Sequence, residues 1–161
     1  MKPNIVLSLL VVLFSWAGPS FAEESEHSDH LEHGHEYHPN VLYGFLGITG
    51  EDRRERAGTV AIEYERRFNE RWGLAAGLEH AFGDLDFTVV TVPVVFHSGK
   101  WGLYAGPGME KHHDHDSEFL FRVGAVYEFE VGEIILAPKF NIDFVDGDTV
   151  LVGGLAVGFG F

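Results

Sequence analysis

Bulky and small residues alternate along the segment 149–161. The odd positions hold apolar side chains, namely Leu151, Leu155, Val157, Phe159 and Phe161, whereas the even positions from Gly154 on hold only Gly and Ala. A two-residue period is typical of a β-strand. The bulky face is too apolar, and the other face too small, for a strand of a water-soluble sheet. The pattern therefore favours a strand with lipid outside and a crowded, narrow barrel inside.

Seven further strands precede this one in the chain. The eight predicted segments are 41–49, 58–68, 72–82, 86–97, 101–110, 118–130, 133–145 and 149–161. Most are close to the roughly 9–11 residues with which a tilted strand crosses a bilayer. The registers of the first and fourth segments stay open. Because lipid cannot satisfy a free sheet edge, the sheet must close. The prediction is an all-β fold, an eight-stranded antiparallel transmembrane β-barrel of the up-and-down type.

The connections between these segments alternate in length. Tight turns at 69–71, 98–100 and 131–132 alternate with the segments 50–57, 83–85, 111–117 and 146–148, which are mostly longer and carry most of the loop charge. Outer-membrane barrels have short periplasmic turns and longer outer loops. With an even number of strands, the start of the first strand and the end of the last strand are then both expected on the periplasmic side.

The first 22 residues are expected to be a cleaved signal peptide. Lys2 precedes a short apolar run at 5–16, and Ser20-Phe21-Ala22 fits a small-x-small cleavage site. The run is shorter than the ~20 residues of a membrane-spanning helix, which disfavours an anchor. We expect three parts: the signal peptide 1–22, a disordered, acidic, His-rich periplasmic tail 23–40, and an outer-membrane barrel 41–161. The chain has no cysteine, so disulfides cannot stabilise it.

Three motifs resemble one family of barrels. The chain reads EYERRFNERWGL at 63–74, VPV at 92–94 and YAGPG at 104–108, which resembles the OmpA-like/opacity-type outer-membrane barrel domain. The resemblance implies the bacterial outer membrane, with its lipid and lipopolysaccharide as partners. The end of the chain resembles the C-terminal signal read by the barrel-assembly machinery, with Leu155, Val157, Phe159 and Phe161 as the signal residues. The fold itself says little about activity.

Charged residues fall on the inward face of the predicted strands. They are Glu63, Glu65, Arg67, Glu79, Glu110, Arg122, Glu128, Glu130, Lys139 and Asp143. One interpretation is a polar pore or a proton path. The other is a network of ion pairs that fills the barrel, and it is favoured because an eight-stranded interior is only wide enough for side chains. The cations are expected to pair with the acids, since a lone buried charge is costly.

Histidines form two clusters among acidic residues. One lies in the predicted tail (His27, His30, His33, His35 and His38) and one in a predicted outer loop (His112, His113 and His115). Imidazole and carboxylate groups bind Zn²⁺, Cu²⁺ or Ni²⁺, and a His-rich tract can gather several ligands. Metal binding is therefore a hypothesis for both clusters, on opposite sides of the membrane. No firm cofactor is indicated.

Charge and motif spacing narrow the functions. The net charge of −14 argues against nucleic acid as a partner. His115 and Ser117 have the His-x-Ser spacing of lipid A deacylases, but Glu118 replaces the Asn of that motif, and His97-Ser98 is interpreted as a turn at the membrane interface. We expect a non-enzymatic barrel with a structural or surface-contact role. The alternatives are a small porin or metal-linked transport component and, less favoured, a lipid A-modifying enzyme.

Overall fold

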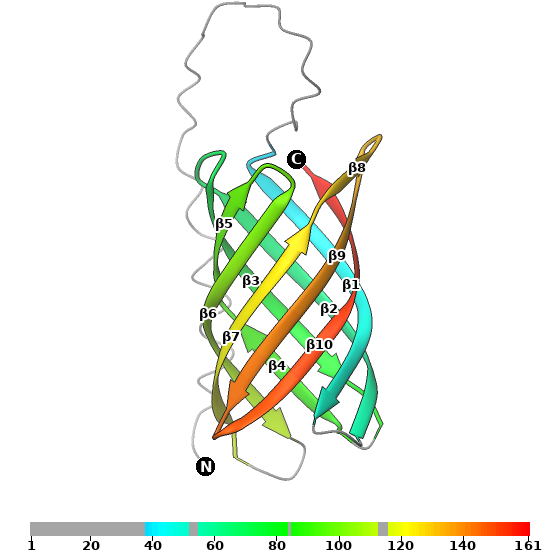
Figure 1. The fold of residues 1–161 in the computed structure, drawn as a ribbon, viewed down its shortest axis with the longest axis vertical. Coiled ribbons are helices and arrows are strands. Elements are labelled where there is room, and N and C mark those ends of the chain that lie inside the picture. Colours follow the sequence, from blue (N-terminus) through cyan, green and yellow to red (C-terminus); the bar gives the residue numbers. More distant parts are fainter. Residues whose placement is uncertain (1–37, 52–54, 84, 113–115) are drawn as a thin grey trace, which may run out of the picture. The chain divides into compact units, whose positions relative to one another are not determined.

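The computed structural model describes residues 38–51, 55–83, 85–112 and 116–161. The expected signal peptide and most of the expected tail lie outside these residues. The described chain is built from strands: β1 (Asn40–Glu51), β2 (Glu55–Arg67), β3 (Trp72–Ala81), β4 (Phe87–Thr91), β5 (Val94–Ser98), β6 (Trp101–His112), β7 (Glu118–Tyr127), β8 (Phe129–Val131), β9 (Ile134–Val145) and β10 (Asp148–Gly160) (Figure 1). Within the described residues, no helix is long and apolar enough to cross a membrane.

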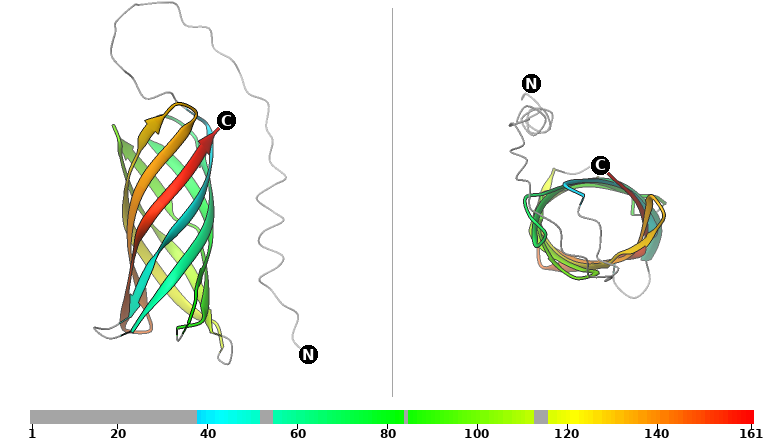
Figure 2. Two further views of the ribbon diagram at one scale, coloured as in Figure 1. Left: turned by 90° about the vertical axis from the view of Figure 1, so that its right-hand side faces the viewer. Right: turned by 90° about the horizontal axis from the view of Figure 1, so that it is seen from above.

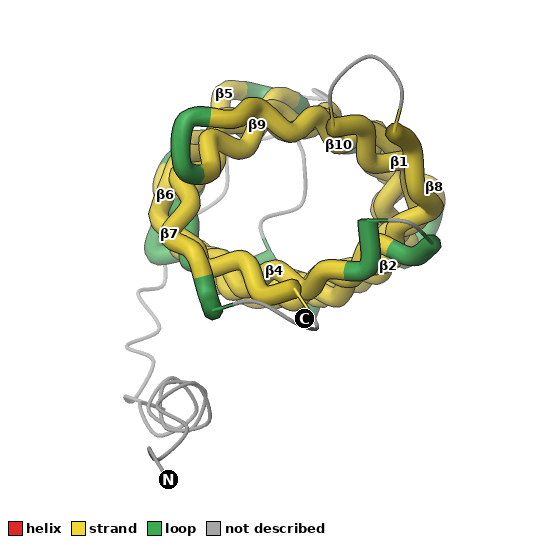
Figure 3. Tube along the Cα trace, turned by 90° about the horizontal axis from the view of Figure 1, so that it is seen from below, coloured by secondary structure: helices red, strands yellow, loops and turns green. Residues whose placement is uncertain are grey.

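The strands close into one antiparallel barrel. β10 pairs with β1 from Val41 opposite Gly160 to Glu51 opposite Val150, so the last strand meets the first (Figures 2 and 3). β4 and β5 both lie between β3 and β6, and β7 and β8 both pair with β9. The ten segments therefore occupy eight strand positions around the barrel. The predicted closed, eight-stranded, antiparallel barrel is confirmed.

Two of the predicted strands are interrupted. The segment 86–97 breaks into β4 and β5 around Pro93, which has no N–H to give to a ladder. The gap stays aligned because Val92 N donates to Pro107 O at 3.0 Å and Ala75 N donates to Pro93 O at 2.9 Å. The segment 118–130 breaks at Glu128, whose N–H donates to Lys100 O at 2.8 Å instead. The expectation of two unbroken strands was wrong at these points.

The structure settles the two open registers. On β1 the inward side chains include Val41, Tyr43, Phe45 and Thr49, all buried. Along β4 and β5 the odd positions point inward throughout: Phe87, Val89, Thr91, Val95 and His97 are buried. Leu46, in contrast, points outward and is 69% exposed. The break at Pro93 thus interrupts the ladder without reversing the two faces.

The outer face of the barrel is apolar. Outward side chains with large exposed areas include Leu42, Leu46, Ile48, Ile62, Leu78, Leu103, Phe121, Ile134, Phe140, Leu155 and Val157. Aromatic rings gather where several strands end, with Trp72 against Phe96 and Trp101 against Tyr127, each at 4.9 Å between ring centroids. An apolar band edged by aromatic rings is the outer surface of a transmembrane barrel.

The first strand begins and the last strand ends at the same end of the barrel. Asn40 N donates to Phe161 O at 3.1 Å, Phe161 N donates to Asn40 O at 2.9 Å, and Asn40 Nδ2 donates to the same Phe161 O at 3.0 Å. We call this end, with the connections 68–71, 99–100 and 132–133, the turn end. The other end, with the connections 52–54, 82–86, 113–117 and 146–147, is the loop end.

The expected contrast between short turns and long loops is mostly lost. β1 runs to Glu51 and β2 starts at Glu55, so most of the predicted loop 50–57 is strand. β6 likewise runs to His112, which shortens the predicted loop 111–117. Pleated strands continue as long as ladder partners face them, and these residues find partners in neighbouring strands. The two ends of the barrel thus differ less than the sequence suggested.

Candidate functional site

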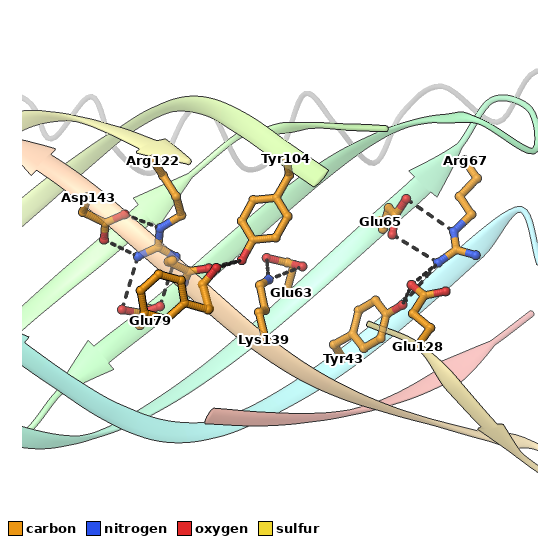
Figure 4. Close-up of polar contacts among 12 residues, drawn as sticks. Tyr43, Glu63, Glu65, Arg67, Glu79, Tyr104, Arg122, Glu128, Lys139 and Asp143 are labelled. Carbon is orange, nitrogen blue, oxygen red and sulfur yellow. Dashed lines mark hydrogen bonds and ion pairs between the residues drawn. The ribbon is translucent and has the colours of Figure 1, made fainter. Parts of the chain in front are cut away.

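The barrel interior holds the polar side chains that the sequence singles out. Figure 4 shows two groups, each centred on one arginine, with a lysine between them. Most of these side chains are buried inside the barrel: Glu65, Arg67, Glu79, Glu110, Arg122, Glu128 and Asp143. Glu63 and Lys139 are nearly buried. The exception is Glu130, which is exposed in β8 at the hairpin with β9. In the ladder it lies opposite the buried Ile135, on the inward face, but it stands where β8 extends beyond the ladder between β6 and β7 and is therefore open to solvent.

The first group, which we call the loop-end cluster, consists of Glu79, Arg122 and Asp143. Arg122 donates from Nε and Nη2 to the two oxygens of Asp143 at 2.7 and 2.6 Å. It also donates from Nη1 and Nη2 to the two oxygens of Glu79 at 3.0 and 3.3 Å. The three side chains are at most 4% exposed. This is a doubly bidentate pairing, in which one guanidinium fork engages two carboxylates.

The second group, the turn-end cluster, consists of Tyr43, Glu65, Arg67, His97 and Glu128. Arg67 Nη2 donates to Glu128 Oε1 at 2.6 Å, and the Tyr43 hydroxyl donates to the same oxygen at 2.6 Å. Arg67 Nε lies 3.3 Å from Glu65 Oε1. His97 Nε2 lies 2.6 Å from that Glu65 oxygen. Each carboxylate therefore has a second partner besides the arginine.

Lys139 and Glu63 lie between the two clusters. Lys139 Nζ donates to both oxygens of Glu63 at 2.7 and 2.6 Å. The ammonium is also 4.7 Å from the centre of the Tyr104 ring, and the Tyr104 hydroxyl donates to Asn141 Oδ1. Pairs of this kind satisfy both charges where water is scarce.

Glycines make room for the two interior tyrosines. A Cβ at Gly158 would lie 2.5 Å from the Tyr43 ring, and one at Gly124 would lie 2.5 Å from Tyr104. Because real Cβ atoms do not approach so closely, any larger residue would displace the rings. The small face of β10 thus seats a bulky neighbour inside the barrel, as its alternation suggests.

The interior leaves little open space. Two cavities among the described residues, both lined by Tyr43, Glu63 and Lys139, have volumes of about 10 Å³ each. That volume corresponds to roughly one water molecule. Side chains therefore fill the barrel between the two clusters.

His97 is a member of the site that sequence reasoning missed. It was expected in a turn at the membrane interface, whereas it lies in β5, points inward and is 5% exposed. The expectation was wrong because β5 continues through Ser98 before the chain turns. The alternation of Phe87, Val89, Thr91 and Val95 would have pointed to it, had the register of that strand been known.

The histidine clusters fall mostly outside the described residues. This applies to His27, His30, His33, His35, His113 and His115. His38 is described and lies against Gly160 at the turn end, next to the start of β1. His112 lies at the loop end, with Nε2 2.9 Å from Glu110 Oε1. Within 38–51, 55–83, 85–112 and 116–161, no group of three or more acidic, His or Cys side chains could hold a metal ion.

The remaining sequence motifs lie on the surface. Leu155, Val157, Phe159 and Phe161 are exposed on the outward face of β10 and at its end. Of the deacylase-like motif, Asp116 and Ser117 are exposed in the 113–117 connection, and His115 lies outside the described residues.

Comparison with known proteins supports the fold alone. No family model and no curated protein matches the chain. The N-terminal β-barrel domain of Pseudomonas aeruginosa OprF superposes with a TM-score of 0.58 at 14% identity, covering 77% of this chain and 98% of that one. The Yersinia pestis outer membrane protein Ail gives 0.51 at 17% identity, covering 78% and 100%. A de novo designed transmembrane β-barrel gives 0.52 at 14% identity, covering 77% and 99%. The chain is thus similar to small β-barrels that cross membranes.

Proposed function

We propose that this protein is an integral barrel of the bacterial outer membrane that does not conduct solutes and has a structural or surface-contact role. One observation carries the proposal: the interior is filled by paired charges, with cavities of only about 10 Å³, while the outer face is apolar. Such an interior favours a membrane-embedded scaffold over a channel. The likeness to the outer membrane protein Ail supports the compartment.

Planar-bilayer recording of the purified barrel tests the absence of conduction. We expect no discrete conductance steps at protein densities at which a general porin gives many. Reproducible steps would overturn the proposal and favour the alternative, a small porin or metal-linked transport component. An Arg122→Met variant serves as the matched comparison, because it removes the cation that holds two carboxylates across the interior. Steps in the variant alone would show that the assay detects an opened barrel.

In this proposal the chain has three parts: the signal peptide 1–22, the periplasmic tail 23–40 and the barrel 41–161, whose first strand begins and whose last strand ends on the periplasmic side. An epitope inserted in 113–117 is expected to bind antibody on intact cells, and an epitope after Ala22 only on opened cells. The reverse labelling would overturn the orientation.

Outer-membrane lipid, lipopolysaccharide and the barrel-assembly machinery are the proposed partners. Deletion of Phe161 is then expected to lower the heat-modifiable folded form on gels, while Phe129→Ala leaves it unchanged.

An enzymatic role is the less favoured alternative. Lipid A from cells that express the protein is expected to have unchanged acyl chains by mass spectrometry. A lost or added acyl chain would overturn the non-enzymatic role. A Ser117→Ala variant then distinguishes the His115–Ser117 motif from an indirect effect.

Binding of divalent metal ions is a second candidate function. The observation that favours it is the contact of His112 with Glu110 at the loop end, 2.9 Å apart, since imidazole and carboxylate are common ligands of Zn²⁺, Cu²⁺ and Ni²⁺. Calorimetry with each ion is expected to show fewer sites in a variant with Ala at 112, 113 and 115, and likewise in one with Ala at 27, 30, 33, 35 and 38. Unchanged binding in both variants would exclude it.

A further inference from the structure

A row of polar side chains lies on the outer face of the barrel near the loop end. It consists of His80 on β3, Thr88 on β4 and Lys111 on β6. His80 lies opposite Thr88, and Thr88 lies opposite Lys111, in the strand register. Their chain neighbours Glu79, Phe87 and Glu110 are buried inside the barrel. Because successive side chains of a strand point to opposite faces, the row points outward.

The row is held in place by its own contacts. His80 Nδ1 lies 3.1 Å from Thr88 Oγ1, and the His80 ring packs edge-on against Phe82 with 4.6 Å between centroids. Thr88 and Lys111 are directly opposite neighbours, whose Cβ atoms are typically about 5 Å apart. Lys111 is exposed, and the His80 side chain is 35% exposed. Three polar groups on three adjacent strands thus face the same small area of the surface.

The row also marks a boundary. The next outward row toward the middle of the barrel is apolar and pairs Leu78 with Val90 and Val90 with Met109. On the other side of the barrel, formed by β9, β10 and β1, the outward Phe144, Leu151 and Ile48 are exposed and apolar near the loop end, whereas Thr149 and, on the neighbouring β2, Arg56 are exposed and polar. On β3, β4 and β6 the outer face thus changes from apolar to polar between two neighbouring rows of side chains.

We propose that this row binds the phosphate group of a lipid headgroup in the leaflet that surrounds the loop end. The inference rests on the proposed placement in the outer membrane. An exposed ammonium is a good partner of a phosphate as a point charge, and a threonine hydroxyl adds a donor beside it. The adjacent apolar row receives the acyl chains of the same molecule. A lipid thus meets both halves of the site, whereas a free anion meets only the polar half.

Asp86 determines which side of the row the phosphate occupies. Its carboxylate lies 3.9 Å from His80 Nε2, whereas Thr88 Oγ1 is near the other ring nitrogen, Nδ1. Because a carboxylate repels a phosphate, the bound phosphate lies at the Lys111 side of Thr88. Removing the Asp86 charge is therefore expected to tighten binding, whereas removing the Lys111 charge weakens it.

The full-length mature barrel in maltoside micelles, which contain no phosphate, allows a direct test by native mass spectrometry. The probes are lipid A with its phosphates, lipid A from which the phosphates have been removed, and inorganic phosphate as a competitor. We expect the phosphorylated lipid to be retained, Lys111→Gln to lower its retention about tenfold, as for loss of one charge-assisted bond, and Asp86→Asn to raise it. Lys100→Gln is the matched control, because Lys100 lies next to the other end of β6 and is also exposed.

Each other outcome overturns the inference. Equal losses for Lys111→Gln and Lys100→Gln would mean non-specific attraction. Equal retention of the phosphate-free lipid would exclude the phosphate. Full competition by inorganic phosphate at lipid concentrations would indicate an anion site and no lipid site. Failure of the outer-membrane placement is seen separately, by fractionation of cells that express the wild-type protein. Unchanged heat-modifiable mobility verifies that each variant folds.

Discussion

The loop-end and turn-end clusters both neutralise two buried carboxylates, but they differ in the number of side chains that bind those carboxylates. Each places one arginine between two buried carboxylates inside the barrel (Figure 4). In the loop-end cluster, Arg122 donates four hydrogen bonds to Glu79 and Asp143. In the turn-end cluster, Tyr43 also binds Glu128, and His97 also binds Glu65.

This difference predicts how substitutions in the barrel interior change the free energy of unfolding. A buried carboxylate is costly when its cation is removed, and cheaper to keep when another donor remains. The loop-end cluster depends on a single side chain, whereas the turn-end cluster spreads the same task over three. Equal substitutions in the two clusters should therefore have unequal effects on the free energy of unfolding.

Arg122→Met has the largest expected effect. It leaves Glu79 and Asp143 buried, at most 4% exposed, without a cation between them. We expect the free energy of unfolding to fall by about 3–5 kcal/mol, measured by urea unfolding of the barrel in lipid vesicles with tryptophan fluorescence.

The control for Arg122→Met adds Glu79→Gln and Asp143→Asn. Neutral amides remove the unpaired charges, so the triple variant should recover a large part of the loss. A triple variant as unstable as the single one would mean that packing of the Arg122 side chain, and not its charge, supports the barrel.

Arg67→Met should cost less, because Tyr43 and His97 still bind the two carboxylates. We expect about 2–3 kcal/mol, the range of hydrogen bonds to charged groups, from the same unfolding curves. A loss as large as that of Arg122→Met would remove the distinction between the two clusters.

Sequence alternation predicted the inward charges because each strand of a membrane barrel has an apolar face toward lipid and a polar face toward the interior. Lys139 and Asp143 alternate with the outward Phe140 and Phe144, so the sequence alone showed which charged residues point inward. Which acid pairs with which base was not readable, since Lys139 and Glu63 are far apart in sequence and meet only through barrel closure. Tyr43 and His97 were missed for another reason: β1 carries apolar residues on both faces, and β4 and β5 are broken at Pro93.

His97→Leu tests the redundancy from the side of Glu65. The imidazole Nε2 lies 2.6 Å from Glu65 Oε1, while Arg67 Nε remains at 3.3 Å. We expect a loss of about 1–2 kcal/mol, and a smaller loss for His97→Gln, whose amide keeps a donor. The two variants are compared in the same vesicles. An equal loss in both would indicate that the ring is needed for its shape.

Tyr43→Phe has the smallest expected effect, and it tests directly whether Tyr43 and Arg67 can replace one another as donors to Glu128. The ring stays packed against Gly158, while the hydroxyl's bond to Glu128 and the longer bond that it accepts from Arg67 Nη2 at 3.2 Å are lost, so we expect about 0.5–1.5 kcal/mol. In the Arg67→Met background the same change should cost more, because Glu128 then loses both of the donors that lie 2.6 Å from Oε1. A double-mutant cycle should give a coupling of at least about 0.5 kcal/mol. Additive losses would mean that the two donors do not replace one another, and the turn-end cluster would then be no more redundant than the loop-end cluster.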